Sequence, residues 1–138
     1  MKLLPYYLED EGAKFSGAIS LAQNSEVLSD DEALLISNYM SSCVVIDEWL
    51  SNVKDALTNK LEVPSKTWSD GVYVWDSLHI HYVKKYRARL PLEFVGHVKK
   101  QVAAGFDPKM LNIDDLSSEF EEILKKVQGD ESYYDGSY

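Results

Sequence analysis

The chain has 138 residues, of which 45% are hydrophobic, and its 23 acidic and 14 basic side chains give a formal net charge of -9. A chain of this length and composition can bury the core of one domain without disulfides or structural metals. The negative charge disfavours non-specific binding to nucleic acid and favours a basic partner. No apolar run reaches the roughly 18 residues that span a bilayer, and the first ten residues lack the long apolar segment of a secretory signal. The sequence therefore predicts a cytoplasmic protein with no membrane partner.

Residues 1–28 predict an irregular N-terminal arm, because prolines and glycines interrupt any long helix there. A long helix is predicted after Ser29, since Ser29 and Glu32 have the spacing of a capping box. Apolar side chains then recur every three or four residues as far as Thr58-Asn59, which predicts one helix over that whole stretch. These side chains are Leu35, Tyr39, Val45, Trp49, Val53 and Leu57. Cys43, the single cysteine, lies inside this predicted helix and is expected to be a buried, unreactive thiol.

A small β-hairpin is predicted in the middle of the chain. Residues 61–64 form a candidate edge strand that contains Pro64. Asp70-Gly71 is a dipeptide favoured in tight turns, and residues 72–75 are β-branched or aromatic. Two strands alone are marginal in water, so the hairpin is expected to pack its aromatic side chains on helices.

Three further helices are predicted after the hairpin. Asp76 or Ser77 caps the first, Pro91 begins the second, and Asn112 caps the third. The predicted fold class is therefore mainly α with a small β-hairpin (α+β), in a single compact helical domain over residues 1–128. Residues 129–138 show no periodicity, which predicts a flexible acidic and aromatic tail.

No set of residues in the sequence predicts an active site. The Gly-x-Ser-x-Gly, Gly-x-x-x-x-Gly-Lys and Gly-x-Gly-x-x-Gly patterns are missing from the sequence. His79 and His81 are two residues apart, so on a helix they point in different directions, and a metal site would need carboxylates from distant segments. We therefore predict a protein that is not an enzyme and holds no cofactor and no metal.

A basic cluster over residues 84–89, with Lys99 and Lys100, is interleaved with aromatic side chains. This combination is typical of nucleic-acid binding. However, Tyr82 and Tyr86 fall on the apolar stripe of their predicted helix, and cations are favoured at a helix C-terminus by its dipole. The sequence therefore predicts no nucleic-acid partner.

Acidic and aromatic side chains near the C-terminus predict a surface for a basic protein, because interfaces favour rigid aromatic contacts and complementary charge. The residues of this candidate surface are Glu119, Glu121, Glu122, Asp130, Glu131, Tyr133, Tyr134 and Tyr138. A second candidate binding region, on the edge of the predicted long helix, consists of Asp47, Glu48 and Asp55.

Residues 69–94 carry a resemblance to a known class of protein. The matching segments are Ser69-Asp-Gly-Val-Tyr-Val-Trp75, Leu78 through Tyr86, Arg89-Leu-Pro91 and Glu93-Phe94. They resemble a pattern in small bacterial proteins, some of which are similar to immunity proteins of toxin–immunity systems. The resemblance implies a cytosolic, non-catalytic protein that occludes a basic toxin domain, and it assigns no toxin-contact residues.

Two alternatives remain open at this point. One is a small metal-dependent hydrolase whose acids and histidines converge only in the fold. The other is an oligomeric accessory protein whose exposed aromatic side chains form a self-interface. The sequence does not specify the oligomeric state.

Overall fold

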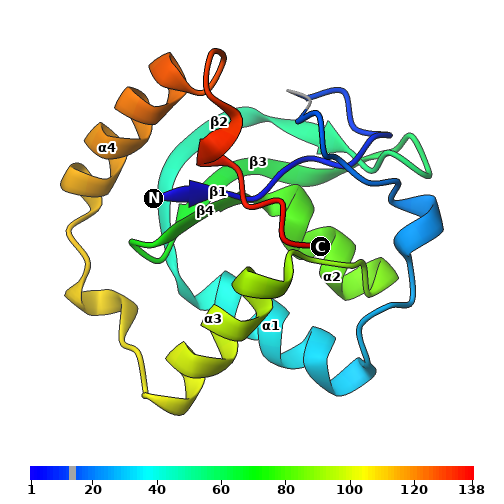
Figure 1. Cartoon of the computed structure of the whole chain (residues 1–138), viewed down its shortest axis with the longest axis horizontal. Helices are drawn as coiled ribbons and strands as arrows, with labels where there is room; N and C mark the ends of the chain where they lie inside the picture. Colours follow the sequence, from blue (N-terminus) through cyan, green and yellow to red (C-terminus); the bar gives the residue numbers. More distant parts are fainter. Residues whose placement is uncertain (13–14) are drawn as a thin grey trace.

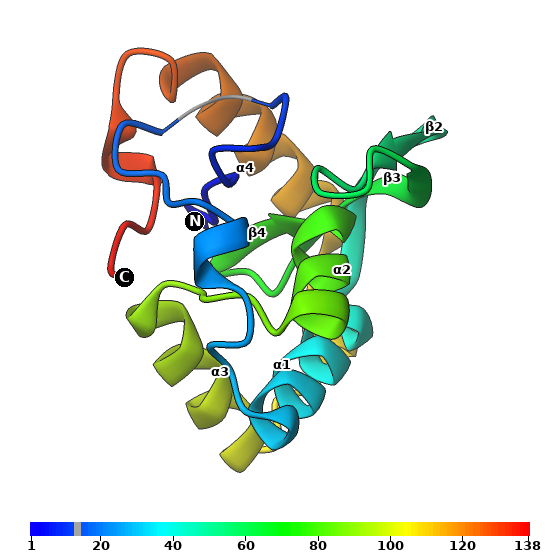
Figure 2. The ribbon, with the colours of Figure 1, turned by 90° about the vertical axis from the view of Figure 1, so that its right-hand side faces the viewer.

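The computed structural model describes residues 1–12 and 15–138, which form four α-helices and a four-stranded mixed sheet. The elements are β1 (Lys2–Leu3), the 3-10 helix η1 (Ala22–Asn24), α1 (Asp30–Ser42), β2 (Val44–Lys54), β3 (Leu61–Ser69), β4 (Tyr73–Asp76), α2 (Ser77–Tyr86), α3 (Leu92–Ala103), η2 (Pro108–Met110), α4 (Ile113–Lys126) and η3 (Glu131–Tyr133). The strand order is β1-β4-β3-β2, in which β1 and β4 are parallel and the other pairs antiparallel. Helices α1, α2 and α3 lie on one side of the sheet and α4 lies on the other (Figures 1 and 2). The C-terminal segment runs beside β1 at the edge of the sheet and reaches the start of α3.

The prediction of a mainly α domain is wrong, because the second half of the predicted long helix is a strand. Helix α1 begins with the predicted capping box of Ser29 and Glu32, but it ends at Ser42. Strand β2 then pairs along β3. Its three consecutive β-branched residues, Val44 to Ile46, fit an extended backbone better than a helix. The apolar side chains keep helix-like intervals from α1 into β2, so the sequence pattern did not indicate where the helix ends.

The predicted hairpin is part of this larger sheet. The turn at Asp70-Gly71 is confirmed, and Gly71 has the positive φ of +91° that glycine adopts without strain. Strand β3 is longer than predicted and lies between β2 and β4 rather than at an edge. Pro64 is tolerated there because β4 pairs only with Thr67 to Ser69, which leaves Pro64 beyond the three-stranded part of the sheet.

The three later helices are confirmed at their starts. Asp76 is the N-cap of α2, Pro91 immediately precedes α3, and the Asn112 side chain accepts a hydrogen bond from the Asp115 amide at the start of α4. Alternate residues of β4 face opposite layers. Tyr73 and Trp75 pack with α1, α2 and α3, whereas Val74 packs with α4.

Within the described residues, five tyrosine hydroxyls each donate a hydrogen bond to a different aspartate. We call these the Tyr–Asp pairs: Tyr6–Asp76, Tyr39–Asp70, Tyr73–Asp135, Tyr82–Asp10 and Tyr86–Asp55. Four of the aspartates are at most 5% exposed, and the fifth is Asp76. The partners are 31 to 72 residues apart, so each pair joins distant segments.

Residues 129–138, predicted as a tail, pack on the sheet and on the start of α3. Tyr134 bridges to Leu3, and the amide of Leu92 donates to the carbonyl of Ser137. Asp135 is buried and accepts the Tyr73 hydroxyl at 2.7 Å. These contacts place residues 129–138 against the domain. The predicted flexibility of this segment stays a prediction.

We predict that Tyr73→Phe lowers the free energy of unfolding by about 1–3 kcal/mol, because the buried Asp135 carboxylate loses a donor. Urea denaturation measures this change. Tyr133→Phe, which changes a partly exposed tyrosine of the segment that carries Asp135, is the control and is expected to change the free energy of unfolding by less than about 0.5 kcal/mol. Equal effects of the two substitutions would contradict the pairing.

Candidate functional site

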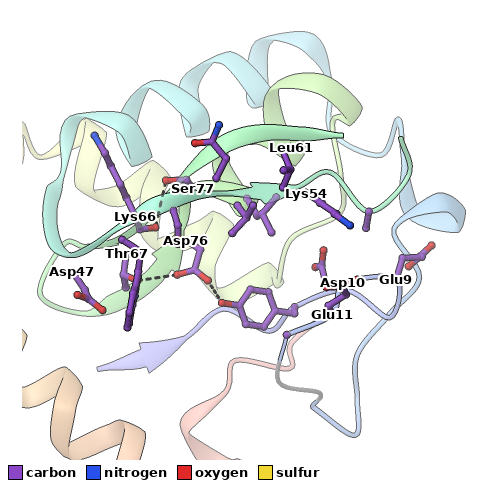
Figure 3. Close-up of a pocket in the computed structure, with 18 of the residues that line it drawn as sticks. Glu9, Asp10, Glu11, Asp47, Lys54, Leu61, Lys66, Thr67, Asp76 and Ser77 are labelled. Atoms are coloured by element: carbon purple, nitrogen blue, oxygen red, sulfur yellow. Dashed lines mark hydrogen bonds between the residues drawn. The ribbon is translucent and has the colours of Figure 1, made fainter. Parts of the chain in front are cut away.

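A groove of about 530 Å³ opens between the N-terminal arm, the outer parts of β2 and β3, the start of α2 and one side of α4. Figure 3 shows its lining, with Asp76 near the middle and Glu9, Asp10 and Glu11 on the N-terminal arm. We consider this groove first because a concave surface with convergent polar groups is the usual form of a binding site.

The outer parts of β2 and β3, residues 48–66, form what we call the β2–β3 arm. It projects away from the helices in Figure 2. Three of its large apolar side chains are in solvent: Trp49 is 66% exposed, Leu61 is 60% exposed and Leu50 is fully exposed. Helix α4 covers the beginning of β2, where the Ser117 hydroxyl donates to the Ile46 carbonyl at 2.9 Å. The exposed residues of β2 begin at Glu48, past this cover.

The groove lining is negatively charged. It contains the carboxyl groups of Glu9, Asp10, Glu11, Asp47 and Asp76 against the two ammonium groups of Lys54 and Lys66. Lys66 also lies 3.8 Å from Glu48, which lowers its effect on the groove. The lining therefore favours a cationic occupant.

Asp76 stands at the centre of the groove because it ends β4 and caps α2. Its Oδ1 accepts a hydrogen bond from the Thr67 hydroxyl at 3.1 Å, and its Oδ2 accepts one from the Tyr6 hydroxyl (Figure 3). Burial raises the pKa of Asp76, and the neighbouring His79 opposes that shift. The backbone amide of Asp76 donates to His79 Nδ1 at 3.0 Å, which holds the first turn of α2.

Asp55 lies in the turn between β2 and β3 and is completely buried. Its Oδ1 accepts the backbone amides of Leu57 and Thr58, and its Oδ2 accepts the Tyr86 hydroxyl and lies 2.8 Å from His81 Nε2. Burial alone would raise the pKa of Asp55, but hydrogen bonds from His81, Tyr86 and the turn amides outweigh it and hold that pKa well below its usual range.

Asp55, Glu62 and His81 form the one group of three metal-ligand side chains that converge within 4.8 Å in the described residues. The Lys85 ammonium lies 3.5 Å from Asp55 Oδ2 and 3.3 Å from Glu62 Oε2. A divalent ion would have to displace this ammonium, so we interpret the group as an internal ion-pair cluster that ties α2 to the β2–β3 turn.

Each histidine is engaged away from the groove. His79 Nε2 lies 3.0 Å from the Pro5 carbonyl, His81 joins the Asp55 cluster, and His97 Nε2 lies 2.7 Å from Asp70 Oδ2. No histidine is among the described residues that line the groove. Cys43 is buried as predicted, although it caps α1 rather than lying inside a long helix, and burial with the nearby Asp70 raises its thiol pKa to about 12.

The predicted binding residues of the middle of the chain are divided by the structure. Asp47 and Glu48 lie on β2 rather than on a helix edge, and Asp47 lines the groove. Asp55 is buried and fully hydrogen-bonded, so its placement on an outer surface was wrong. The error follows from the missed strand, since a turn at Asp55 cannot be seen while the segment is treated as helix.

The predicted C-terminal residues lie on α4 and the segment after it. Exposed carboxylates among them are Glu119, Glu121, Glu122, Asp130 and Glu131. Some already have partners: Glu119 pairs with the N-terminal amine at 3.0 Å, and Glu122 pairs with Lys125 at 3.1 Å. Tyr133 and Tyr134 are half-buried and pack against the apolar cluster under α4. The groove residues Tyr6, Thr67 and Asp76 were not predicted as a site.

Comparison with known proteins gives no relative. No family model, no curated protein and no solved structure matches the chain. Within the part of the chain that the structure describes, no helix combines the length and apolar character needed to cross a membrane.

We predict that Asp55→Ala lowers the free energy of unfolding at pH 7 by about 1.5–3 kcal/mol, because the amides of Leu57 and Thr58 and the Tyr86 hydroxyl lose their buried carboxylate acceptor. Asp47→Ala removes a partly exposed acid from the preceding strand β2, and is expected to cost less than about 1 kcal/mol. Urea denaturation of the three proteins makes the comparison.

The same cluster predicts a pH dependence. Because the pKa of Asp55 is lower in the folded than in the unfolded chain, its contribution is fully present above about pH 4–5 and is lost as the pH falls further. The stability difference between wild type and Asp55→Ala should therefore shrink from pH 7 to pH 3. A difference that stays constant or grows over this range would contradict the assignment.

Proposed function

We propose that the protein is a non-catalytic binding protein that holds a basic protein partner on the face formed by the groove and the β2–β3 arm. The observation that carries the proposal is the exposure of Trp49, Leu50 and Leu61 next to a groove lined by carboxylates. Interfaces commonly combine an apolar centre with a charged border, and aromatic side chains are their strongest anchors.

Exposure of these side chains is costly to an unbound protein, which supports a role for them in binding. A projecting edge strand with large apolar side chains favours aggregation unless something covers it or shapes it. Register shifts in the β2–β3 pairing interrupt the regular strand edge, and Lys54 and Lys60 add charge at the end of the arm. The side chains of Trp49 and Leu50 remain uncovered, as expected for a surface that is completed by a partner.

The class of partner that we propose is a toxin domain, with the protein acting in the cytoplasm as its immunity protein. The net charge of -9 and the negative groove suit a basic domain. Residues 69–94 resemble a pattern in small bacterial proteins, some of which are similar to immunity proteins. The mechanism would be stoichiometric occlusion, in which the arm covers the toxin's functional surface. The acids of α4 would add to the field that attracts the partner and speed association.

The immunity role predicts that a toxin domain is encoded beside the gene, and it is tested by co-expressing the chain with that domain. We expect growth of cells to be restored and a one-to-one complex to be seen by light scattering. A neighbouring toxin that stays lethal and forms no complex would contradict the role, as would turnover of a small substrate by the chain alone.

We predict that Trp49→Ala weakens this complex by about 30-fold or more, because truncating a central aromatic anchor commonly costs at least about 2 kcal/mol. Leu92→Ala, which changes an exposed apolar residue at the start of α3, is the matched control and should change the dissociation constant by less than about threefold. Calorimetric titration gives both values. Equal values for wild type and Trp49→Ala would exclude the arm as the binding surface.

A further inference from the structure

We infer that Asp76 is a receptor for a guanidinium group: an arginine side chain of the protein partner enters the groove and pairs with the Asp76 carboxylate. The inference rests on the proposed function, since it names the chemistry by which the same groove holds a basic partner. It comes from a difference between Asp76 and the other aspartates of the Tyr–Asp pairs.

Two of the other pairs already contain a basic group. Asp55 lies against His81 and Lys85, and Asp70 lies against His97. Both carboxylates also accept two backbone amides in their turns. These basic groups and amides already stabilise the two carboxylates inside the fold.

The remaining two aspartates are almost fully buried and take backbone donors, although Asp10 also lies in the groove lining. Asp10 is 5% exposed and accepts the amide of Tyr7 at 2.9 Å as well as the Tyr82 hydroxyl. Asp135 is 3% exposed and accepts the amide and the hydroxyl of Ser137. Backbone amides are strong donors for a carboxylate, so these groups are satisfied locally.

Asp76 differs in lacking an ion pair and in its position. Its side chain accepts the hydroxyls of Thr67 and Tyr6 and, in the capping box of α2, the backbone amide of His79. No ion pair to Asp76 occurs among the described residues. The group is partly buried and yet lines the groove. Burial raises its pKa in spite of the opposing effect of His79, which is the response of a carboxyl group whose charge has incomplete compensation. A cation that enters the groove would supply the missing compensation.

The rest of the lining fits a guanidinium better than an ammonium. The groove offers the aromatic rings of Tyr6 and Trp49, on which a planar guanidinium can stack. Apolar side chains from three elements, Leu61, Leu78 and Phe120, can pack on the aliphatic stem of an arginine. A guanidinium can also donate to both oxygens of one carboxylate, which an ammonium does less well.

The surrounding charge favours the same occupant. Glu11 and Asp47 line the groove together with Asp76 and extend the negative potential along it. Lys66, one of the two cations of the lining, is 3.8 Å from Glu48 and so is partly neutralised. This negative potential would repel an anionic occupant.

The probe for this inference is N-acetyl-arginine amide, titrated into the isotope-labelled full chain and followed by NMR. We expect the largest chemical-shift changes at Tyr6, Thr67 and Asp76. The citrulline amide, which has nearly the same shape without the charge, should bind at least about tenfold more weakly, because it lacks the charge-assisted hydrogen bonds that a guanidinium makes to a carboxylate. Equal binding of the two amides, or shifts located elsewhere, would overturn the inference.

Asp76→Asn is the decisive variant, because asparagine is as good an N-cap as aspartate and should preserve α2. We expect it to lose at least about tenfold in arginine amide affinity. Asp47→Asn removes one charge from the same groove and should lose less than about threefold. Thr67→Val removes a neutral donor and keeps the carboxylate, so it should retain binding. A loss in Thr67→Val or Asp47→Asn equal to that in Asp76→Asn would overturn the assignment to Asp76.

The inference and the proposed function fail separately. If arginine amide binds at Asp76 while the chain forms no complex with a toxin domain, the function is wrong and the pocket stands. If a toxin complex forms with the same dissociation constant for wild type and Asp76→Asn, the pocket is wrong and the function stands.

Discussion

A buried carboxylate must receive donors from the fold, and this constraint organises the whole molecule. The described residues bury four aspartates in Tyr–Asp pairs, and none of these has its tyrosine nearby in sequence. Without its donors a buried carboxylate would be strongly unfavourable, so the segments that carry each pair must come together. The pairs join the N-terminal arm to α2, the β2–β3 turn to α2, the β3–β4 turn to α1, and the C-terminal segment to β4.

These connections also build the groove. The pair Tyr82–Asp10 holds one wall, the N-terminal arm, against α2, and the Asp55 cluster holds the base of the β2–β3 arm against the same helix. Asp76 lies between these two walls at the start of α2 (Figure 3). The four Tyr–Asp pairs with buried aspartates thus hold the segments of the fold together, while the carboxyl group of the fifth pair, Asp76, lies in the groove between those segments. This division explains why many acids in the chain carry a structural role and one central acid is placed for a ligand.

Local patterns in the sequence predicted what short-range physics determines. The capping residues Ser29, Asp76 and Asn112 and the turn at Asp70-Gly71 were all confirmed, because each satisfies backbone groups only a few residues away. Strand β2 was missed since its apolar residues also recur at helical intervals, and only its pairing with β3 selects the extended form. The fold class was wrong for that reason.

The groove could not be predicted because its parts come from segments with no local signal of proximity. Tyr6 and Asp76 are 70 residues apart, and Asp76 was identifiable only as a helix cap. Asp55 was predicted on a surface because a strand and its turn were treated as helix. A pattern of tyrosines and aspartates is visible in the sequence, but which tyrosine meets which aspartate depends on the sheet order.

The most direct test of this account is the titration of the aspartate side-chain carboxyl carbons by NMR. The account predicts that Asp76 titrates above the usual value of about 3.9 and that Asp55 titrates below it, because burial dominates at the first and donated hydrogen bonds dominate at the second. If Asp76 titrated at or below its ordinary value, its charge would already be compensated within the fold, and the division between scaffold carboxylates and a ligand-facing one would be contradicted.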